Sequence, residues 1–99
     1  MGDRKIALVT GASKGIGAAS AVGLAKDGYD IWLNYRSSHG AARQVKKKVE
    51  QTGSHCLLLP FDVADPVSVV KKLYPLLEEE TPYILVNNAG FTKDMLMIW

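Results

Sequence analysis

A glycine-rich loop between an apolar run and a helical pattern constrains the fold of this chain more than any other feature. Residues 5–10 are apolar on both faces, as expected of a strand buried on two sides in a parallel sheet. Glycines follow at positions 11, 15 and 17, and apolar residues then recur at helical spacing as far as a glycine at position 28. The sequence therefore predicts a strand, a glycine loop and a helix, in that order.

The same alternation continues along the chain. Strands are predicted at residues 30–35, 55–59 and 83–88, with a helix between each pair. Four such strands imply parallel crossovers with helices on both faces, which is the α/β class and a Rossmann-type doubly wound sheet of order 3-2-1-4. The fourth strand would then be an uncovered edge, although it is strongly apolar. We therefore expect residues 1–99 to be the truncated N-terminal part of one larger domain.

The third helix carries a conflicting signal. Asp65 is predicted to be its N-cap, with Pro66 at the first helical position. The buried face is predicted to consist of three apolar residues at helical spacing: Val70, Leu73 and Leu77. Pro75 lies inside this pattern and lacks the backbone N–H that a helix interior needs, so a kink or an early end is expected near Tyr74.

Composition excludes several classes of protein. A chain of 99 residues with 47% hydrophobic and 22% charged residues is an ordinary globular domain, not a disordered or coiled-coil one. The net charge of +2 is too small to indicate a nucleic acid or a membrane surface as partner. The single cysteine, Cys56, cannot form an internal disulfide, and no signal peptide or membrane anchor opens the chain, so a cytoplasmic location is expected. His39 and His55 have no partner at a metal-ligand spacing.

The first glycine loop has the properties of a phosphate-binding loop. Open α/β sheets bind ligands beyond the carboxyl ends of their strands, where the strand order reverses. Gly11 permits the tight turn, Gly15 lets the backbone approach a pyrophosphate, and Gly17 lets the helix lie close to the strand. The free amides and the positive dipole end of the helix would face the phosphates, so we expect a dinucleotide here.

The loops after the second and third strands refine this expectation. No carboxylate stands where one would hydrogen-bond a ribose 2′-hydroxyl, whereas Arg36 and Lys14 could meet a 2′-phosphate, which favours NADP over NAD. The alternative is that both cations are simply exposed. Asp62 could accept a hydrogen bond from the adenine amino group, with the following amide of Val63 donating to the ring. Asp62 could equally be a loop cap.

Three motifs together resemble the short-chain dehydrogenase/reductase family. They are the Gly-x3-Gly-x-Gly loop at residues 10–17, Asp-Val-Ala-Asp at 62–65 and Asn-Asn-Ala-Gly at 87–90. The resemblance covers the whole chain. Within the family, residues 86–94 and the Met-Leu-Met that follows are most similar to the 3-oxoacyl-(acyl-carrier-protein) reductases of fatty-acid synthesis.

The resemblance implies a role for each motif in binding NADPH. The residues that would hold the pyrophosphate and the adjoining ribose are Gly11, Ser13, Lys14, Gly15, Ile16 and Gly17. Those that would hold the 2′-phosphate are Arg36 and Ser37, and those that would hold the adenine are Asp62 and Val63. The ribose nearer the nicotinamide would pack on Asn88, Ala89 and Gly90, whereas Asn87 would fasten the fourth strand to its neighbours.

The resemblance also implies an activity that this chain cannot perform alone. Family members reduce a carbonyl with a tyrosine as general acid, a lysine four residues later, a serine and an asparagine. None of the four tyrosines here has a lysine at that distance, so no catalytic residue is predicted and the 99 residues should be inactive. The parent protein is expected to be an NADPH-dependent reductase of a small-molecule or acyl-carrier-bound ketone, and a homo-oligomer.

Two other functions remain open from the sequence. The chain could be a non-catalytic nucleotide-binding or interaction module that pairs the exposed edge of its fourth strand with another chain. An unrelated doubly wound domain, such as a methyltransferase, also has a glycine loop after its first strand. The loops at residues 62–63 and 88–90 argue against that last possibility.

Overall fold

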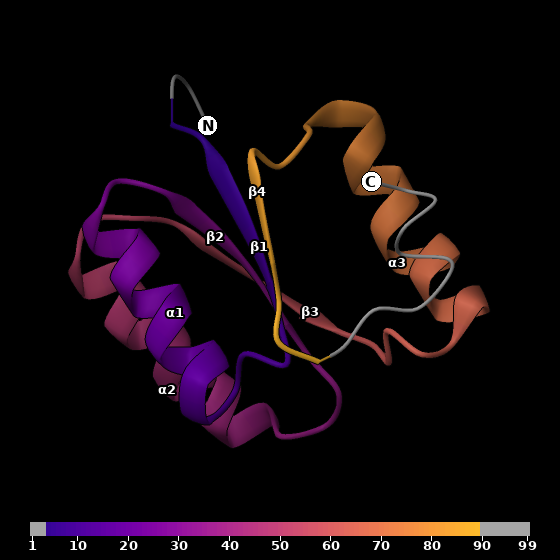
Figure 1. Ribbon diagram of the computed structural model, residues 1–99, viewed down its shortest axis with the longest axis horizontal. Helices are drawn as coiled ribbons and strands as arrows, with labels where there is room; N and C mark the ends of the chain where they lie inside the picture. Colours follow the sequence, from indigo (N-terminus) through magenta and orange to yellow (C-terminus); the bar gives the residue numbers. More distant parts are fainter. Residues whose placement is uncertain (1–3, 90–99) are drawn as a thin grey trace.

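The computed structural model describes residues 4–89 and contains a parallel sheet with helices on both faces (Figure 1). In chain order the elements are β1 (Ile6–Thr10), α1 (Gly15–Lys26), β2 (Asp30–Tyr35), α2 (His39–Gln51), β3 (Cys56–Pro60), α3 (Pro66–Glu79) and β4 (Ile84–Asn87). The strands lie in the order β3-β2-β1-β4 and every neighbouring pair is parallel. The predicted fold class and strand order are therefore confirmed.

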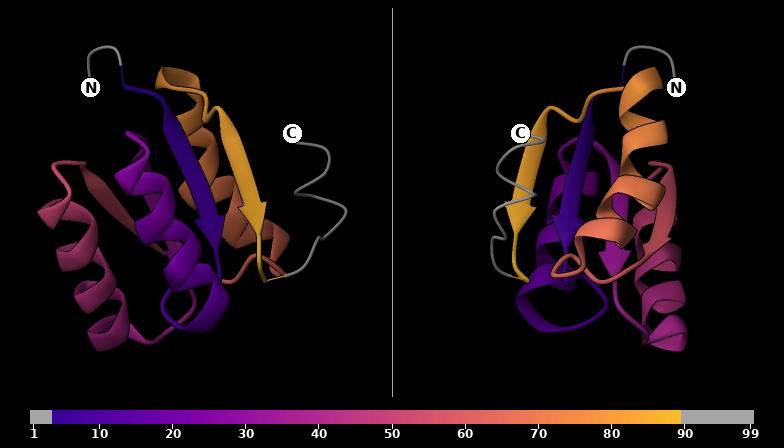
Figure 2. Two further views of the ribbon diagram at one scale, coloured as in Figure 1. Left: turned by 60° about the vertical axis from the view of Figure 1, so that its left-hand side comes forward. Right: turned by 90° about the vertical axis from the view of Figure 1, so that its right-hand side faces the viewer.

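The helices are divided unequally between the two faces of the sheet. Figures 1 and 2 show α1 and α2 together on one face and α3 on the other. The division follows from the topology, because the connection from β3 must cross to the far side of β1 before β4 begins. Alternate residues of β1 accordingly enter two separate cores, with Ala7 and Val9 facing α1 and α2 and with Ile6 and Leu8 facing α3.

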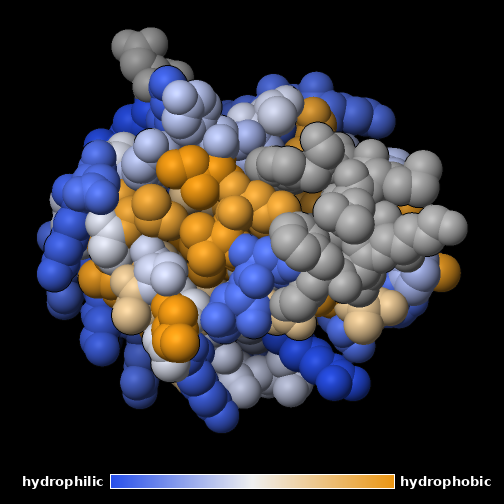
Figure 3. Space-filling model, viewed as in Figure 1, coloured by the Kyte–Doolittle hydropathy of each residue, from blue (hydrophilic) through white to orange (hydrophobic). Residues whose placement is uncertain are grey.

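The two central strands and the edge strand β4 differ in burial. Every residue of β1 and β2 is buried, as their apolar sequences predict. Every residue of β4 is only partly buried, and no strand in the described part of the chain pairs with its outer side. Figure 3 shows an apolar area over β4 and the neighbouring part of α1. In these two elements Val22, Ile84 and Val86 are partly buried and pack against the core. The larger sheet that this edge suggests stays a prediction.

Helix α3 corrects two expectations. The cap is as predicted, since the Asp65 side chain accepts a hydrogen bond from the Val67 amide (3.2 Å) and Pro66 opens the helix. The buried face is as predicted at Leu73, and Leu77 packs partly buried on the core, but Val70 is wrong: it is 48% exposed, and Val69 is buried instead. The apolar residues of the helix form one face that is broader than the side meeting the sheet, so periodicity alone does not decide which of them are buried.

The early end predicted near Tyr74 is also wrong, because α3 continues to Glu79. Pro75 lies on the exposed side of the helix, where water can hydrogen-bond the carbonyl left without a donor. β3 likewise extends one residue further than predicted and includes Pro60, which pairs with Tyr35 of β2. Among residues 4–89, no helix has the length and the apolarity that crossing a bilayer requires.

Candidate functional site

The predicted site residues gather at the carboxyl end of the sheet. Because all the strands are parallel, the loops after β1, β2, β3 and β4 lie at the same end, and Figure 2 shows the strand arrows pointing to it. The sequence motifs at residues 11–17, 36–37, 62–63 and 88–89 occupy these loops. Gly90, the last predicted site residue, lies outside the described residues.

The glycine loop needs glycine for two different reasons. Gly11 and Gly15 both have a φ of +58°, which side-chain-bearing residues rarely adopt. No atom would lie within 4 Å of a Cβ at Gly15, so this backbone stands open to a ligand. A Cβ at Gly17 would instead collide with the carbonyl oxygen of Gly11 and would lie 2.8 Å from Nδ2 of Asn88. The close approach predicted for Gly17 is therefore to the loop after β1 rather than to the strand.

The N-terminus of α1 is free to accept an anion. Its N-cap, Lys14, makes no side-chain capping bond, and no acidic residue lies in the first turn of the helix. The first amides of a helix have no partner within the helix and carry its positive dipole end. Lys14 and Gly15 are exposed, and Ile16 is 77% exposed. The loop thus presents backbone donors, a cation and an apolar side chain to solvent at one place.

Asn34 ties together the loops at the carboxyl end of the sheet, a role that was not predicted from the sequence. Its side chain is buried in β2, and Nδ2 donates to the carbonyls of Leu59 and Phe61, both at 3.0 Å. Its Oδ1 accepts from the amide of Gly11 (3.4 Å), and its backbone carbonyl accepts from Ala12 (2.9 Å). One residue therefore joins the loops after β1 and β3. A polar residue near the end of an otherwise apolar run was the available signal.

A second network fastens the end of β4 to the glycine loop. The Thr10 hydroxyl donates to Oδ1 of Asn87 (3.0 Å) and accepts from the amide of Ala89 (3.1 Å). Asn88 donates from Nδ2 to the carbonyl of Gly11 (3.1 Å). Asn87 thus links β4 to β1 as expected, while the Asn88 side chain is already engaged with the loop beneath the predicted ribose.

The residues predicted to contact the 2′-phosphate and the adenine touch each other. Nε of Arg36 lies 3.6 Å from Oδ2 of Asp62, and the Arg36 side chain is 79% exposed. The other carboxylate oxygen of Asp62 accepts from the amide of Ala64 (2.9 Å), so Asp62 does cap its own turn. The carboxylate is held by the backbone, whereas Arg36 meets it in an exposed ion pair, which contributes little and which another anion could replace.

Neither the histidine next to the site nor the cysteine is placed for catalysis or metal binding. The hydroxyl of Tyr35 lies 2.8 Å from Nδ1 of His39, and the two rings meet edge to face. No group of three metal-ligating side chains occurs within residues 4–89. Cys56 is buried, as predicted, and burial raises its pKa to about 12, so it carries almost no nucleophilic thiolate at neutral pH.

Comparison with known proteins agrees with this arrangement. The family described as short chain dehydrogenase matches residues 5–98. General stress protein 39 of Bacillus subtilis is 42% identical over 87 residues, which are 87% of this chain and 30% of that protein. A 3-oxoacyl-(acyl-carrier-protein) reductase of Staphylococcus epidermidis is 37% identical over 95 residues, which are 95% of this chain and 39% of that protein. The chain therefore spans well under half the length of these relatives.

Solved structures extend the likeness to three dimensions. The acetoin dehydrogenase YohF of Salmonella typhimurium superposes with a TM-score of 0.77 at 31% identity, over 90% of this chain and 37% of that one. The acetoin dehydrogenase of Enterobacter cloacae gives a TM-score of 0.79 at 29% identity, over 94% and 37%. By sequence, strand order and loop positions, the chain belongs to the short-chain dehydrogenase family.

Proposed function

We propose that this chain is the cofactor-binding part of an NADPH-dependent carbonyl reductase. The observation that carries the proposal is the N-terminus of α1, which has no side-chain cap. It begins at Gly15, where a Cβ would meet no atom within 4 Å, and it lies at the carboxyl end of the sheet, where the strand order reverses. Oxidoreductases among the relatives support the reaction class. In this proposal residues 1–99 form the N-terminal part of a single Rossmann domain.

Positive charge at the end of β2 supports NADP as the cofactor. Lys14, Arg36 and Ser37 are all exposed at the same edge of the sheet. A 2′-phosphate would offer the Arg36 guanidinium two charges in place of the one on Asp62, so the arginine would exchange partners. The backbone-held Asp62 would stay in place and accept from the adenine amino group.

Each remaining predicted residue has a part in the proposal. Gly11, Ser13, Gly15, Ile16 and Gly17 would surround the pyrophosphate and its ribose, and Val63 would flank the adenine. Asn88, Ala89 and Gly90 would support the second ribose. Bound NADPH would supply hydride to a carbonyl, and this chain's own residues would fix where the dinucleotide lies.

The substrate and the catalytic residues belong to the whole protein. A relative named 3-oxoacyl-(acyl-carrier-protein) reductase supports a 3-oxoacyl group as substrate, and a versicolorin reductase of Emericella nidulans, 42% identical over 93 residues, supports carbonyl reduction more broadly. Residues 1–99 contain no tyrosine followed four residues later by a lysine. We therefore propose that the 99-residue chain is inactive and that the complete protein is a homo-oligomer; the cytoplasmic location stays a prediction.

Calorimetric titration of the 99-residue chain with NADPH and NADH tests the proposal. NADPH should bind at least about tenfold more tightly than NADH, and Arg36→Asp should reverse that order. Arg43→Asp makes the same charge change on the exposed face of α2 and should leave the preference unaltered. Binding of neither nucleotide would refute the cofactor site, and equal binding of both would refute the choice of NADP.

The exposed edge of β4 supports a second candidate, a non-catalytic interaction module. Its four residues are partly buried, and Nδ2 of Asn87 is a buried donor without a partner in the described part of the chain. An added strand could satisfy this edge. A chain that binds an extended peptide along β4 but neither nucleotide would favour this function over the first.

A further inference from the structure

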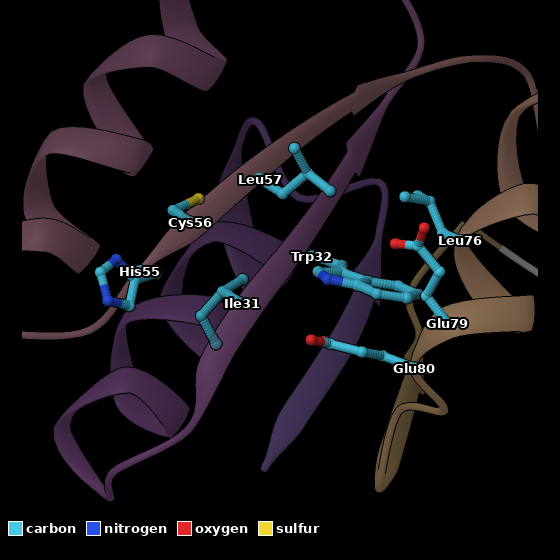
Figure 4. Close-up of a pocket in the computed structure, with 8 residues that line it drawn as sticks. All are labelled: Ile31, Trp32, His55, Cys56, Leu57, Leu76, Glu79 and Glu80. Carbon is cyan, nitrogen blue, oxygen red and sulfur yellow. The ribbon is translucent and has the colours of Figure 1, made fainter. Parts of the chain in front are cut away.

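Asn34 is a buried polar residue among the apolar pairs of β2 and β3. Figure 4 shows one of these pairs, Trp32 of β2 and Leu57 of β3, nearer the amino end of the strands. Asn34 pairs in register with Leu59 and is only 2% exposed. Burying a side-chain amide costs free energy unless its polar atoms find partners inside the protein. An amide at this position is therefore tolerated only when it is hydrogen-bonded.

The Asn34 side chain connects the end of β3 to the glycine loop. Its Nδ2 donates to the carbonyls of Leu59 and Phe61, each at 3.0 Å, and its Oδ1 accepts from the Gly11 amide at 3.4 Å. A primary amide has two N–H donors and an acceptor oxygen on one planar group, so a single side chain serves both directions. Ionised aspartate has the same shape but no donor, and leucine has neither kind of atom. The connection therefore depends on asparagine itself.

Backbone hydrogen bonds extend the connection on both sides. The carbonyl of Asn34 accepts from the Ala12 amide (2.9 Å), and the carbonyl of Tyr35 accepts from the Phe61 amide (3.0 Å). Asp62 follows Phe61 directly, and the glycine loop continues from Ala12 to the N-terminus of α1. Asn34 therefore stands between the carboxylate proposed to meet the adenine and the backbone proposed to meet the pyrophosphate.

Asn34 has no direct access to a ligand. Its side chain is buried, and both of its polar atoms already have partners in the protein. The side chain is also uncharged, so it adds no net charge that would attract a phosphate. Any effect of Asn34 on a nucleotide must therefore pass through the two segments that it joins.

We propose that Asn34 is a positioning residue that holds the glycine loop and the loop after β3 at the separation that one nucleotide requires. The inference rests on the proposed cofactor function and adds that one buried side chain joins the adenine and pyrophosphate halves of that site. A ligand that spans both loops gains affinity when the loops are already in place, because binding then orders nothing further. A ligand that occupies one loop gains nothing from the connection.

The two halves of one ligand test the connection. Adenosine would reach the loop after β3, inorganic pyrophosphate would reach the glycine loop, and ADP would span both. NMR titration gives the three dissociation constants for the parent chain and for Asn34→Asp, which keeps the shape of the side chain but cannot donate to both carbonyls. ADP should bind about tenfold more weakly to the variant, whereas each half should change by less than about twofold.

The outcomes separate this inference from the proposed function. A parent chain that binds ADP, with equal affinity in Asn34→Asp, would overturn the inference alone. An equal loss for ADP and for one of its halves would also overturn it, because Asn34 would then shape a single loop. A parent chain that binds none of the three ligands would refute the cofactor site and the inference together.

Ser54→Ala is the control for a general loss of stability. Ser54 is also buried, and its hydroxyl donates to the carbonyl of Ala25 (3.1 Å), but it precedes β3 at the amino end of the sheet. This variant loses a buried hydrogen bond as well, and it should leave all three dissociation constants unchanged. An equal loss of ADP affinity in both variants would show only an effect of stability and would overturn the positioning role.

A second measurement needs no substitution at Asn34. The side-chain amide protons of Asn34 should shift in the NMR spectrum of the parent chain when adenosine or pyrophosphate is added separately. The reason is that each half would contact a loop to which this amide is bonded, although the amide itself is buried. A response to only one half would overturn the inference, which keeps the test decisive if Asn34→Asp does not fold.

Discussion

The two ends of the parallel sheet use their buried polar groups in opposite ways. At the carboxyl end these groups are neutral: the buried Thr10 and Asn34 and the partly buried Asn87 hold the loops through hydrogen bonds of amides and a hydroxyl. At the amino end the neutral Ser54 is buried beside a buried charge, Asp30, whose Oδ1 accepts from Nε of Arg4 (2.9 Å) and from the amide of His55 (2.8 Å). The first end is organised without charge and the second is neutralised internally.

The difference is the reason for assigning the proposed cofactor to the carboxyl end. Neutral amides at the carboxyl end leave the positive end of α1 without a buried counter-charge, and the exposed Arg36 faces only the partly exposed carboxylate of Asp62, which a phosphate could replace. At the amino end the Arg4 guanidinium is already engaged with both Asp30 and Ser54. An anion arriving there would have to displace a carboxylate that is buried and twice hydrogen-bonded.

The most damaging break of this comparison is Gly17→Ala at the carboxyl end. The new Cβ would strike the Gly11 carbonyl, so we expect a loss of about 2–3 kcal/mol in the free energy of unfolding together with loss of NADPH binding. Gly23→Ala, in the same helix, is the control. A Cβ there would meet no atom within 4 Å, so this change should raise the free energy of unfolding by up to about 1 kcal/mol. Urea unfolding measures both; equal stabilities would contradict the close contact.

A break at the amino end should lower stability but leave the cofactor site intact. Asp30→Asn keeps the shape of the side chain and removes the charge that Arg4 faces, at an expected cost of about 1–2 kcal/mol. The NADPH dissociation constant should not change. Asp27→Asn, at the exposed C-cap of α1, is the control and should be nearly neutral. A weaker affinity for NADPH in Asp30→Asn would show that the two ends are coupled.

Much of the fold was predictable because the alternation of apolar runs and helical patterns leaves few topologies. The exposed flank of α3 was not. Val69 and Val70 are equally apolar, and only the direction in which the chain leaves the Asp65 turn decides which of them meets the sheet. Local pattern gives the period of a helix, and tertiary contact gives its phase.

In the candidate site too, local features were predictable from the sequence and contacts between distant residues were not. The glycine positions were predictable because their conformations are local, and Gly11 and Gly15 both have the positive φ that glycine allows. The function of Asn34 was not, since its partners at Leu59 and Phe61 become neighbours only when β2 pairs with β3. The contact between Arg36 and Asp62 escaped prediction for the same reason.

Removing the ion pair between Arg36 and Asp62 tests the carboxyl end more specifically, with a smaller expected effect. Asp62→Asn should change stability by less than about 1 kcal/mol, because the ion pair with Arg36 is exposed. Both nucleotides would lose an adenine contact, but only NADPH gains from an unopposed guanidinium, so the ratio of NADPH to NADH affinity should rise about two- to fivefold. Competitive titration measures the ratio. A ratio that falls would place the 2′-phosphate away from Arg36.

The last prediction concerns Cys56, a buried thiol at the amino end. Burial raises the pKa of its thiol from 9.0 to about 12, so the folded chain holds this proton more tightly than the unfolded chain does. The resulting stability is fully present below pH 9 and is lost as the pH rises toward 12. About 1 kcal/mol of it is lost by pH 10. Urea unfolding of the parent chain and of Cys56→Ala, each at pH 8 and pH 10, isolates the contribution. The variant should be the less stable of the two at pH 8, because it loses packing at the start of β3, and the gap should narrow at pH 10. A gap that stays constant would mean that the thiolate is solvated in the folded chain.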